Sequence, residues 1–570
     1  MKRGRYVLII LAIFFVLIVS TLVSFLFLEF KKAPPVKSHS YLEINLSGEI
    51  RERAESDVFT SLFGIRPPLS MFDLWRNIQK AKNDTRIESL VLRLGLLQCD
   101  WAKIEEIRQS ILDFRESGKK VFAYIGEAMD FDKEYYLATA CDHIVLHPLG
   151  TLILNGIGGY VPFIKNSLDM LGIEAEFEHV EEYKTAGNMF TEKGFTPAHR
   201  EMMESIYSDF FDIYVRGVAA ARNIGEDEFL RIIDQAFFRA DEAKELLLVD
   251  ELLHEDEFEN FLNQDGYKKT RISHSQYTNI SPSSVGLDRG KKIALIYGMG
   301  PIHTGSGLNQ TIGSTSFAHL IRRARKDTSV DALVFRIDSP GGSAIASDII
   351  MREIVLTKKI KPVIVSMSDV AGSGGYWVAM NADRIVAQPQ TLTGSIGVVS
   401  GKFNMSGLFD KLGITSERIV FGKMADIFTP FRSLTPEERA LLKKQILWIY
   451  DEFTTKVAEG RGLQKNEVDK IGKGRVWTGQ QAKELGLVDE IGGLSKAIEL
   501  AKELIQTPSG ESVRLEVWPK KTSFFESIFR RKLVGSKAQW EFKLQKLVDI
   551  FELLQNEKTL ALMPFWQSPK

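Results

Sequence analysis

The sequence predicts an α/β protein in which two copies of one domain follow a single N-terminal transmembrane helix. Two segments, roughly 40–265 and 291–505, carry the same series of motifs, which indicates duplicated domains. Within each copy, short β-branched runs alternate with helical patterns, and this order favours parallel strands joined by helices. One long helical pattern starts with a capping box, in which Thr435 is followed by Glu438 three residues later.

The charge-free run at 6–28 predicts a membrane anchor. At about 1.5 Å of rise per residue it is long enough to cross the ~30 Å hydrocarbon core of a bilayer. It exceeds the ~7–15 apolar residues of a cleaved signal peptide, and no small-residue cleavage site follows it. Basic residues precede it at positions 2, 3 and 5, which favours a cytoplasmic N-terminus. We therefore expect residues from about 38 onward to lie outside the cytoplasm.

The two copies match at an offset of about 239–243 residues. SLVLRLG (89–95) matches ALVFRID (332–338), and RADEAKELLLVDEL (239–252) matches TGQQAKELGLVDEI (478–491). The predicted division of the chain is a cytoplasmic stub with the anchor (1–37), a first repeat (38–265), a polar, Ser-rich linker (266–290), a second repeat (291–507) and a C-terminal helical tail (508–570).

The overall composition excludes some classes of function. Lys and Arg number 73 against 74 Asp and Glu, so the chain offers no basic field for a nucleic acid partner. Cys99 and Cys141 are the only cysteines, and their spacing is that of neither a zinc site nor a redox motif.

Two glycine-rich turns occur in the second copy and are missing from the first. One is DSPGG (338–342), and the other is AGSGGYW (371–377), in which Ser373 lies between a predicted strand and a helix. A serine at such a position has an exposed hydroxyl beside free backbone N–H groups at the helix start. The glycines Gly341, Gly342 and Gly374 let the backbone approach a substrate, and their amides could hold an oxyanion. This pattern favours Ser373 as a nucleophile.

A serine nucleophile needs a base, and no histidine occurs after His319. A lysine can take this role if burial lowers its pKa, because the neutral amine then accepts the hydroxyl proton. Lys184 and Lys423 occupy equivalent positions in the two copies, each after an apolar strand. The residues alone leave both lysines open as the base.

Four motifs together carry a family resemblance. The sequences YKTAGNMF, DSPGG, GSGGYW and TLTGSIG, in this order, resemble signal peptide peptidase A in its long, tandem form. The resemblance covers about 40–505 and the anchor. It implies a crotonase-like fold related to the Clp protease, a place in the bacterial inner membrane with the catalytic body on the periplasmic side, and degradation of signal peptides left in the membrane. It also implies a homotetramer, peptide substrates, and no metal or organic cofactor.

The resemblance assigns roles by motif. It makes Ser373 the nucleophile, Lys184 of the first copy the general base, and Ser395 the residue that holds the lysine. Gly341 or Gly342, with Gly374, would form the oxyanion hole.

The second copy also retains Lys423, where single-copy relatives carry their base. If each serine position meets the lysine of the next repeat around a ring, Lys423 faces the vacant first-copy site. The repeat alignment places Asp132 there, so we expect an Asp132–Lys423 ion pair.

Two other functions fit parts of the sequence. A crotonase-fold enzyme acting on acyl-CoA thioesters would share the oxyanion hole, but it needs neither an anchor nor a nucleophilic serine. A non-catalytic membrane scaffold is the second alternative, since the first copy has lost its paired glycines (GLLQC, 95–99).

Overall fold

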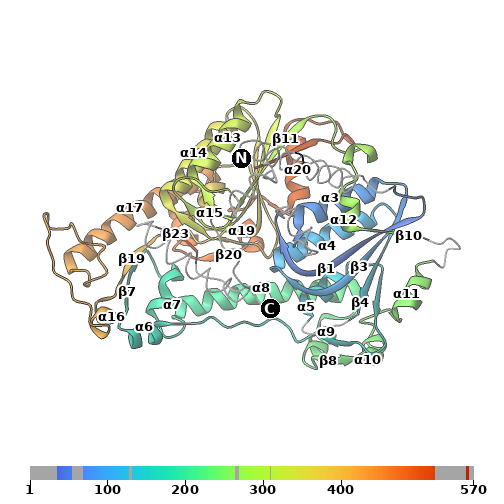
Figure 1. Ribbon diagram of the computed structural model, residues 1–570, viewed down its shortest axis with the longest axis horizontal. Helices are drawn as coiled ribbons and strands as arrows, with labels where there is room; N and C mark the ends of the chain where they lie inside the picture. The colour runs from blue at the N-terminus through green and yellow to red at the C-terminus, as the bar shows by residue number, and fades with distance from the viewer. Residues whose placement is uncertain are drawn as a thin grey trace, which may run out of the picture.

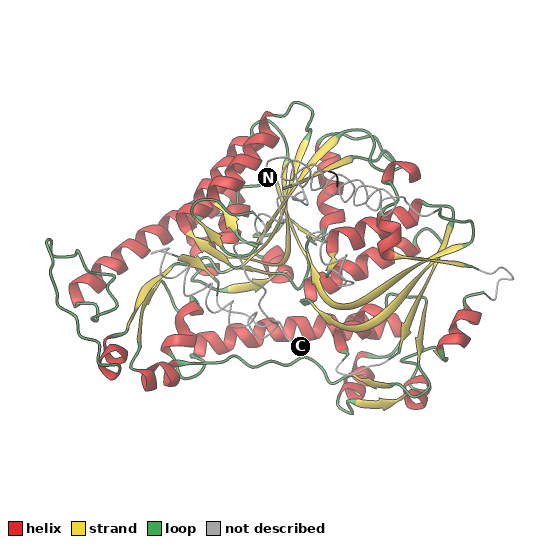
Figure 2. Cartoon of the chain, in the orientation of Figure 1, coloured by secondary structure: helices red, strands yellow, loops and turns green. Residues whose placement is uncertain are grey.

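The computed structural model describes residues 35–53, 68–126, 131–263, 269–308, 310–519 and 560–563, together with Phe14. Figures 1 and 2 show two twisted sheets beside each other, with helices packed around them. Apart from Phe14, the predicted anchor at 6–28 lies outside the described residues. Among the helices of the described part, none is both long enough and apolar enough to span a bilayer.

The first repeat forms a parallel sheet in the order β10-β1-β3-β4-β5-β9, with β2 beside β1. Its strands are β1 (Ser40–Arg51), β2 (Leu69–Ser70), β3 (Ile87–Gln98), β4 (Lys120–Ile125), β5 (His143–Leu146), β9 (Glu251–Leu252) and β10 (Thr270–Ser273). Its helices and remaining strands are α3 (Met71–Asn83), α4 (Trp101–Arg115), α5 (Asp132–Ala138), β6 (Thr151–Ile153), α6 (Lys165–Leu171), β7 (Glu174–His179), η1 (Thr185–Gly187), α7 (Asn188–Thr191), α8 (Pro197–Arg222), α9 (Glu226–Ile233), β8 (Phe237–Arg239), α10 (Ala240–Glu245), α11 (Glu255–Phe261) and α12 (His274–Thr278).

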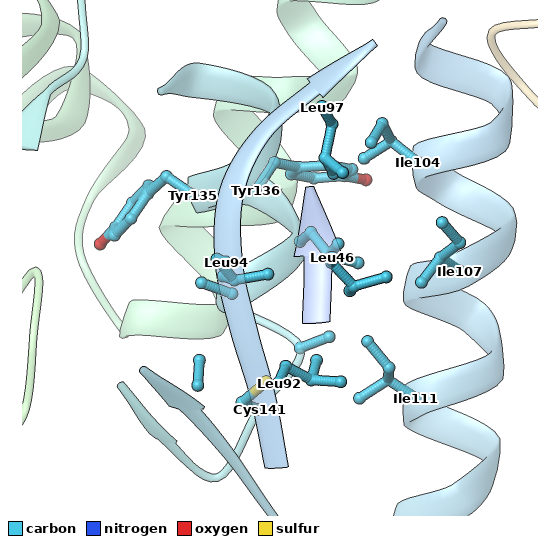
Figure 3. Packing of buried hydrophobic residues seen from close by; sticks show 14 of the residues in the cluster. Leu46, Leu92, Leu94, Leu97, Ile104, Ile107, Ile111, Tyr135, Tyr136 and Cys141 are labelled. Carbon is cyan, nitrogen blue, oxygen red and sulfur yellow. The ribbon is translucent and has the colours of Figure 1, made fainter. Parts of the chain in front are cut away.

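Leucine and isoleucine side chains fill the space between this sheet and α4. Ile104, Ile107 and Ile111 recur at helical spacing and face Leu92 and Leu94 of β3 (Figure 3). All five side chains are buried. Burial of such side chains stabilises the fold by about 1.5–3 kcal/mol each.

Part of the predicted linker belongs to the first repeat. Residues 270–278 form β10 and α12, and β10 pairs with β1. Tyr277 is fully buried, and its hydroxyl donates to Asp84 Oδ2 at 3.0 Å. The polar composition of this segment predicted a linker, because residues 270–278 contribute only two apolar side chains, Ile272 and Tyr277, to the core. The first repeat therefore extends beyond the predicted boundary at 265.

The second repeat forms a sheet in the order β20-β18-β16-β14-β11-β22, in which β17 also pairs with β16 and β21 pairs with β17. Its pairings are parallel except that of β18 with β20. Its strands are β11 (Lys292–Met299), β14 (Ala332–Ser339), β16 (Val363–Gly372), β17 (Arg384–Ala387), β18 (Leu392–Gly394), β20 (Val476–Thr478), β21 (Glu490–Ile491) and β22 (Arg514–Trp518). The helices are η2 (Pro282–Val285), α13 (Ser314–Lys326), α14 (Ala344–Lys358), α15 (Gly374–Ala379), α16 (Ser406–Lys411), α17 (Pro436–Arg461), α18 (Lys465–Ile471), α19 (Gly479–Glu484) and α20 (Leu494–Leu504).

Two sequence predictions can be compared with this repeat. The capping box is confirmed, because the Thr435 side chain accepts from the Glu438 N–H at the start of α17. The tail differs from the predicted helices where it is described, since β22 at 514–518 is an edge strand of the second sheet. Residues 520–559 of that tail lie outside the described residues.

A third sheet connects the two repeats in the order β13-β12-β15-β23-β19-β7. Its second-repeat strands are β12 (Ile302–His303), β13 (Ile312–Gly313), β15 (Gly341–Ser343) and β19 (Val399–Asn404), and β23 (Leu560–Leu562) comes from the end of the chain. Strand β7 of the first repeat pairs antiparallel with β19 over six residue pairs. The long helix α8 runs beneath both repeats and contacts β20 (Figure 1).

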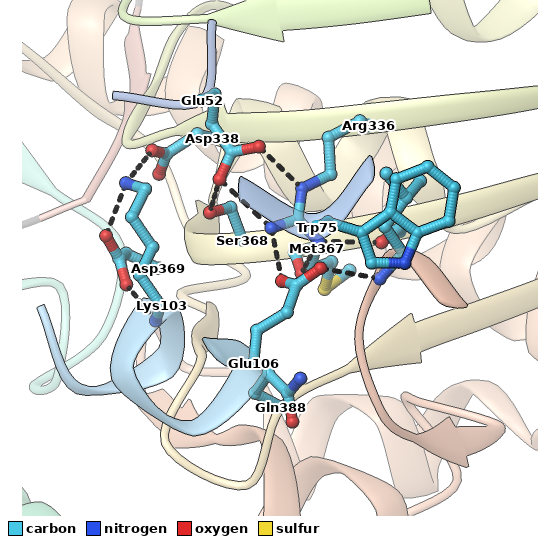
Figure 4. Close-up of polar contacts among 12 residues, drawn as sticks. Glu52, Trp75, Lys103, Glu106, Arg336, Asp338, Met367, Ser368, Asp369 and Gln388 are labelled. Carbon is cyan, nitrogen blue, oxygen red and sulfur yellow. Dashed lines mark hydrogen bonds and ion pairs between the residues drawn. The ribbon is translucent and has the colours of Figure 1, made fainter. Parts of the chain in front are cut away.

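Buried ion pairs hold the repeats together (Figure 4). Arg336 of β14, 1% exposed, donates to Glu52 at 2.9 and 3.0 Å and to Glu106 of α4 at 2.6 Å. Burial alone would lower the pKa of this guanidinium, but Glu106 and Glu52 raise it well above its usual range. Because each charge has a partner, the network fixes how the repeats dock.

Candidate active site

Ser373 lies in the sharp turn between β16 and α15. Its backbone has φ 55° and ψ −112°, a conformation that is uncommon for a residue with a side chain. Its N–H donates to Gly394 O at 2.8 Å, and its carbonyl accepts from Trp377 N–H at 2.8 Å. The surrounding backbone therefore holds Ser373 in the strained turn.

Glycine is required at two places around this turn. Gly342 has φ 152°, and a Cβ there would collide with Ile302 O. A Cβ on Gly375 would lie 2.9 Å from Ser339 O. The two glycine-rich turns predicted from the sequence thus pack directly against each other at the carboxyl ends of β14 and β16.

Lys184 reaches this turn from the other repeat. The pairing of β7 with β19 carries the first-repeat chain onto the second repeat, and Val180 N–H donates to Val398 O at 3.1 Å just beyond the strands. Two glycines leave room for the lysine. A Cβ on Gly474 would lie 2.5 Å from Lys184 Cα, and one on Gly397 would lie 3.0 Å from Lys184 Cδ.

The Lys184 amine contacts both serines named from the sequence. Nζ lies 2.7 Å from Ser373 Oγ, 3.1 Å from Ser395 Oγ and 3.0 Å from Ser395 O. All three residues are 0% exposed. Burial lowers the pKa of Lys184 well below its usual value, with no carboxylate among the causes. The site therefore favours a neutral amine.

Ser395 is itself fixed by the backbone. It follows β18, has φ 50°, and donates its N–H to Arg475 O at 2.7 Å. Its carbonyl therefore keeps a constant position beside the lysine.

The other expected residues fall into two groups. Gly341 and Gly342 lie in β15, and Gly374 is the first residue of α15, where its N–H has no acceptor within the helix. The structure thus places all three glycines in the turns next to Ser373. Lys423 lies elsewhere, with its side chain 73% exposed and its Nζ 2.7 Å from Glu437 Oε1.

The expected Asp132–Lys423 ion pair is not formed within the chain, so the prediction is wrong for a single chain. Asp132 is 3% exposed and accepts from Tyr214 Oη at 2.7 Å and from Gly156 N–H at 3.2 Å. A phenol and backbone amides therefore stabilise the carboxylate where we expected a lysine.

Sequence reasoning missed one residue that supports the site. Lys103 of α4 donates to Asp338, the first residue of the DSPGG turn, at 2.8 Å and to Asp369, which precedes the AGSGGYW turn, at 2.5 Å (Figure 4). Burial would lower the pKa of Lys103, but the two carboxylates raise it well above its usual range. The signal in the sequence that could have indicated this contact is the aspartate at or near the start of each glycine-rich turn. Its partner, in the other repeat, carries no motif.

Comparison with known proteins identifies the family. The model of peptidase family S49 matches residues 113–267 and 356–507, one region in each repeat. "Serine protease SPPA, chloroplastic" from Arabidopsis thaliana is 35% identical over 84% of this chain and 71% of its own length.

Two bacterial relatives extend the match. "Protease 4" from Salmonella typhi is 35% identical over 76% of this chain and 72% of its own length. "Protease 4" from Haemophilus influenzae is 31% identical over 85% of this chain and 82% of its own length. Among solved structures, ClpP1 from Listeria monocytogenes covers 36% of this chain and 94% of its own, with 17% identity and a TM-score of 0.23. With an S49 region in each repeat and relatives aligned over most of its length, the chain belongs to peptidase family S49 and is a serine peptidase of the tandem form.

Proposed function

We propose that Ser373 is the nucleophile of this peptidase and that Lys184 is its general base. The observation that carries this proposal is the 2.7 Å separation of Lys184 Nζ from Ser373 Oγ inside a fully buried site. This distance lies within the reach that proton transfer requires. Each repeat therefore supplies one member of the dyad.

Burial, which lowers the pKa of Lys184, favours the neutral amine, and we assign its hydrogen bonds on that basis. A neutral amine has two N–H donors and one lone pair, whereas an ammonium has three donors. Ser395 O and Ser395 Oγ take the two donors, at 3.0 and 3.1 Å. The remaining lone pair then accepts the Ser373 hydroxyl proton. Ser395 thus acts as a positioning residue that aims the lone pair.

The reaction is acyl transfer to Ser373 followed by hydrolysis. Lys184 takes the hydroxyl proton as Ser373 Oγ bonds to the peptide carbonyl carbon, and it then gives that proton to the departing amine. Water, deprotonated by the same lysine, then bonds to the acyl carbon, and the bond from that carbon to Ser373 Oγ breaks as the lysine returns the proton to Oγ. The oxyanion would accept from Gly374 N–H and from Gly342 N–H, since Gly341 N–H already donates to Ser339 Oγ at 3.2 Å.

We propose extended apolar peptides as substrates, including signal peptides left in a membrane after processing. Two observations support this class. The charge-free run at 6–28 is long enough to anchor the chain in a bilayer, and the basic residues before it favour a catalytic body outside the cytoplasm. In bacteria that body would lie on the periplasmic side of the inner membrane.

We also propose that the chain assembles as a homotetramer. The pairing of β7 with β19 joins the first repeat to the second. The equivalent pairing, between the second-repeat counterpart of β7 and the first-repeat counterpart of β19, is not formed within the chain. The equivalent segments, about 414–420 and 158–163, are described and contain no strand. They expose Tyr160 (93%), Ile419 (84%) and, next to them, Phe421 (92%). A second copy would pair these segments and continue the ring. The purified chain in detergent should have the mass of four chains, and Ile419→Asp should reduce it. An unchanged mass would refute this pairing.

The dyad is tested by matched substitutions at the two equivalent lysines. Lys184→Ala should lower kcat/KM for a quenched apolar peptide by about 10²–10⁴-fold, the usual contribution of a general base. Lys423→Ala removes an exposed lysine and should leave kcat/KM unchanged. If Lys423→Ala abolishes hydrolysis and Lys184→Ala does not, the second repeat uses its own lysine and the cross-repeat dyad is wrong.

A further inference from the structure

Arg475 lies at the boundary between the two repeats, next to the candidate dyad. It immediately precedes Val476, the first residue of β20, and its carbonyl accepts the Ser395 N–H at 2.7 Å. Its own N–H donates to Gly472 O at 2.8 Å. The main chain of Arg475 therefore fixes the residue that contacts the Lys184 amine.

The residue before Arg475 contacts both the lysine and the segment that carries Ser395. Gly474 N–H donates to Ile396 O at 2.8 Å, one residue after Ser395. A Cβ on Gly474 would lie 2.5 Å from the N, Cα and Cβ atoms of Lys184, so the two main chains are in direct contact. Residues 474–475 therefore form a wall that the base and its positioning serine share.

The Arg475 side chain contacts the first repeat. Its guanidinium carbon lies 4.9 Å from the ring centre of Tyr183, the residue before Lys184, and 4.3 Å from the ring centre of Trp477. Two of its nitrogens donate to the Glu201 carboxylate on α8, at 2.5 and 2.8 Å. A guanidinium suits this place, because its plane stacks on aromatic rings while its fork pairs with a carboxylate.

The groups around the guanidinium are also held in place. The hydrogen bond from Arg475 lowers the pKa of Glu201, so this carboxylate is ionised at neutral pH. The Trp477 indole donates its N–H to Ile471 O at 2.9 Å. The Arg475 side chain itself is only 13% exposed, so its pair with Glu201 is partly shielded from water. These contacts tie the chain that leads into Lys184 to the second repeat.

We propose that Arg475 is a positioning residue for the catalytic lysine. Its side chain holds Tyr183 and with it the start of the lysine segment, while its carbonyl holds Ser395. One residue thereby keeps the Lys184 amine 2.7 Å from Ser373 Oγ and closes the site to water. This inference rests on the proposed function, in which Ser373 and Lys184 form the dyad.

Loss of the guanidinium should displace the lysine and admit water to its amine. A misplacement of about 1 Å costs up to about 10²-fold in rate, so kcat should fall about 10- to 10²-fold. KM should stay unchanged, because the contacts act on the groups that transfer the proton. Burial lowers the pKa of Lys184, and hydration would return that pKa toward its usual value. The acid limb of kcat/KM should then move to higher pH.

The test measures hydrolysis of a quenched apolar peptide across pH, by the full chain and its variants in detergent. Arg475→Met should show both the fall in kcat and the shift of the acid limb. Glu201→Gln replaces a side chain that is 53% exposed, so the fold should tolerate it, and it should cause a smaller shift in the same direction. Tyr183→Leu removes the ring next to Lys184. Arg475→Met added to Tyr183→Leu should lower kcat less than about twofold further, because the same contact is already lost.

Arg222→Met is the matched control. The Arg222 side chain is 12% exposed and donates to the two carboxylate oxygens of Asp250 at 2.8 and 3.3 Å, within the first repeat. Urea unfolding should show a loss of stability similar to that of Arg475→Met, while kcat and the acid limb should match the wild type.

Two results would overturn the proposal. One is an acid limb that stays in place in both Arg475→Met and Glu201→Gln, and the other is an equal shift in Arg222→Met. Ser373→Ala and Lys184→Ala test the dyad separately. If either of them keeps wild-type hydrolysis, the catalytic assignment fails. If both are inactive and the acid limb has not moved in the Arg475 and Glu201 variants, the dyad stands and only the role of Arg475 is refuted.

Discussion

The first and second repeats use the same contacts to hold the helix that starts at the catalytic position. Tyr135, three residues after Asp132, donates its hydroxyl to Leu248 O at 2.8 Å. Tyr376, three residues after Ser373, donates to Leu487 O at 3.0 Å. The two helices α5 and α15 are therefore anchored alike, and Asp132 occupies the first-repeat counterpart of Ser373.

A second pair of contacts is also duplicated. Arg222 donates to Asp250 at 2.8 Å, and Arg461 donates to Asp489 at 2.7 Å. In both repeats the aspartate also accepts a backbone N–H of the neighbouring strand. The scaffold thus survived duplication in both copies.

The two copies differ in what surrounds the catalytic position. Asp132 is enclosed by donors, with Tyr214 and two backbone amides directed at its carboxylate. Ser373 instead faces the Lys184 amine and glycine-rich turns. A carboxylate stabilised by donors is a poor base and cannot replace a nucleophile that needs its proton removed. Duplication therefore allowed one copy to keep the lysine and the other to keep the serine.

The largest expected effect comes from substituting Ser373, and the matched control is a substitution at Asp132. Ser373→Ala should reduce kcat/KM by about 10⁵–10⁶-fold, as loss of a serine nucleophile does elsewhere. Asp132→Asn, at the matched position, should change kcat/KM less than about threefold, because no substrate group meets it. It should cost about 1–3 kcal/mol of stability through its weakened hydrogen bonds.

Peptide hydrolysis measures the change in kcat/KM, and urea unfolding measures the change in the free energy of unfolding. A loss of more than about a hundredfold in Asp132→Asn, with the fold intact, would mean that the first-repeat position contributes to the chemistry.

The second effect concerns the contact between the repeats. Lys103→Met removes the cation between Asp338 and Asp369 and should cost about 3–5 kcal/mol of unfolding free energy, since it leaves buried carboxylates unpaired. Activity should fall as well, because Asp338 begins one glycine-rich turn and Asp369 precedes the other. Lys120→Met is the control, since the Lys120 side chain is 63% exposed and its pair with Asp142 should be worth about 0–1 kcal/mol. Equal losses in the two variants would show that the buried pair adds nothing.

Local patterns were sufficient for the duplicated α/β fold and for choosing Ser373, whereas Lys184 and Ser395 were chosen from the family resemblance. The glycine-rich turns and the capping box are properties of a few adjacent residues, so the sequence displays them directly. The partners of Lys103 lie in the other repeat, 235 and 266 residues away in the chain, and no periodicity encodes that contact. Strand β23 is short and lies far along the chain from β15, so its pairing could not be read from composition.

The third effect is a pH dependence that distinguishes the two equivalent lysines. The folded-state pKa of Lys184 is lowered by burial, from 10.5 in the unfolded chain. Between these pKa values the unfolded chain holds one more proton, so wild-type stability rises with pH through this window. Lys184→Met should therefore be more stable than wild type at low pH, and its advantage should shrink as the pH rises toward 10.5.

Thermal unfolding across pH measures this difference, and the acid limb of kcat/KM should fall at the folded-state pKa of Lys184. Lys423→Met, which replaces an exposed side chain paired with Glu437, should show no pH-dependent gain. A constant difference in unfolding free energy between Lys184→Met and wild type at all pH values would contradict a lowered pKa of Lys184.

The smallest effect is expected for Ser395→Ala. The first repeat has Asp132 in place of a serine nucleophile, so it has no lysine base to position there. The substitution removes the Ser395 Oγ contact with Lys184 but keeps the Ser395 carbonyl contact. One neutral hydrogen bond is worth about 1 kcal/mol, so kcat should fall about fivefold with KM unchanged. The acid limb of the kcat profile should also shift, because the amine loses one acceptor. A loss of about 10³-fold would instead make Ser395 part of the proton transfer, and an unchanged pH profile would show that its hydroxyl does not orient the lysine.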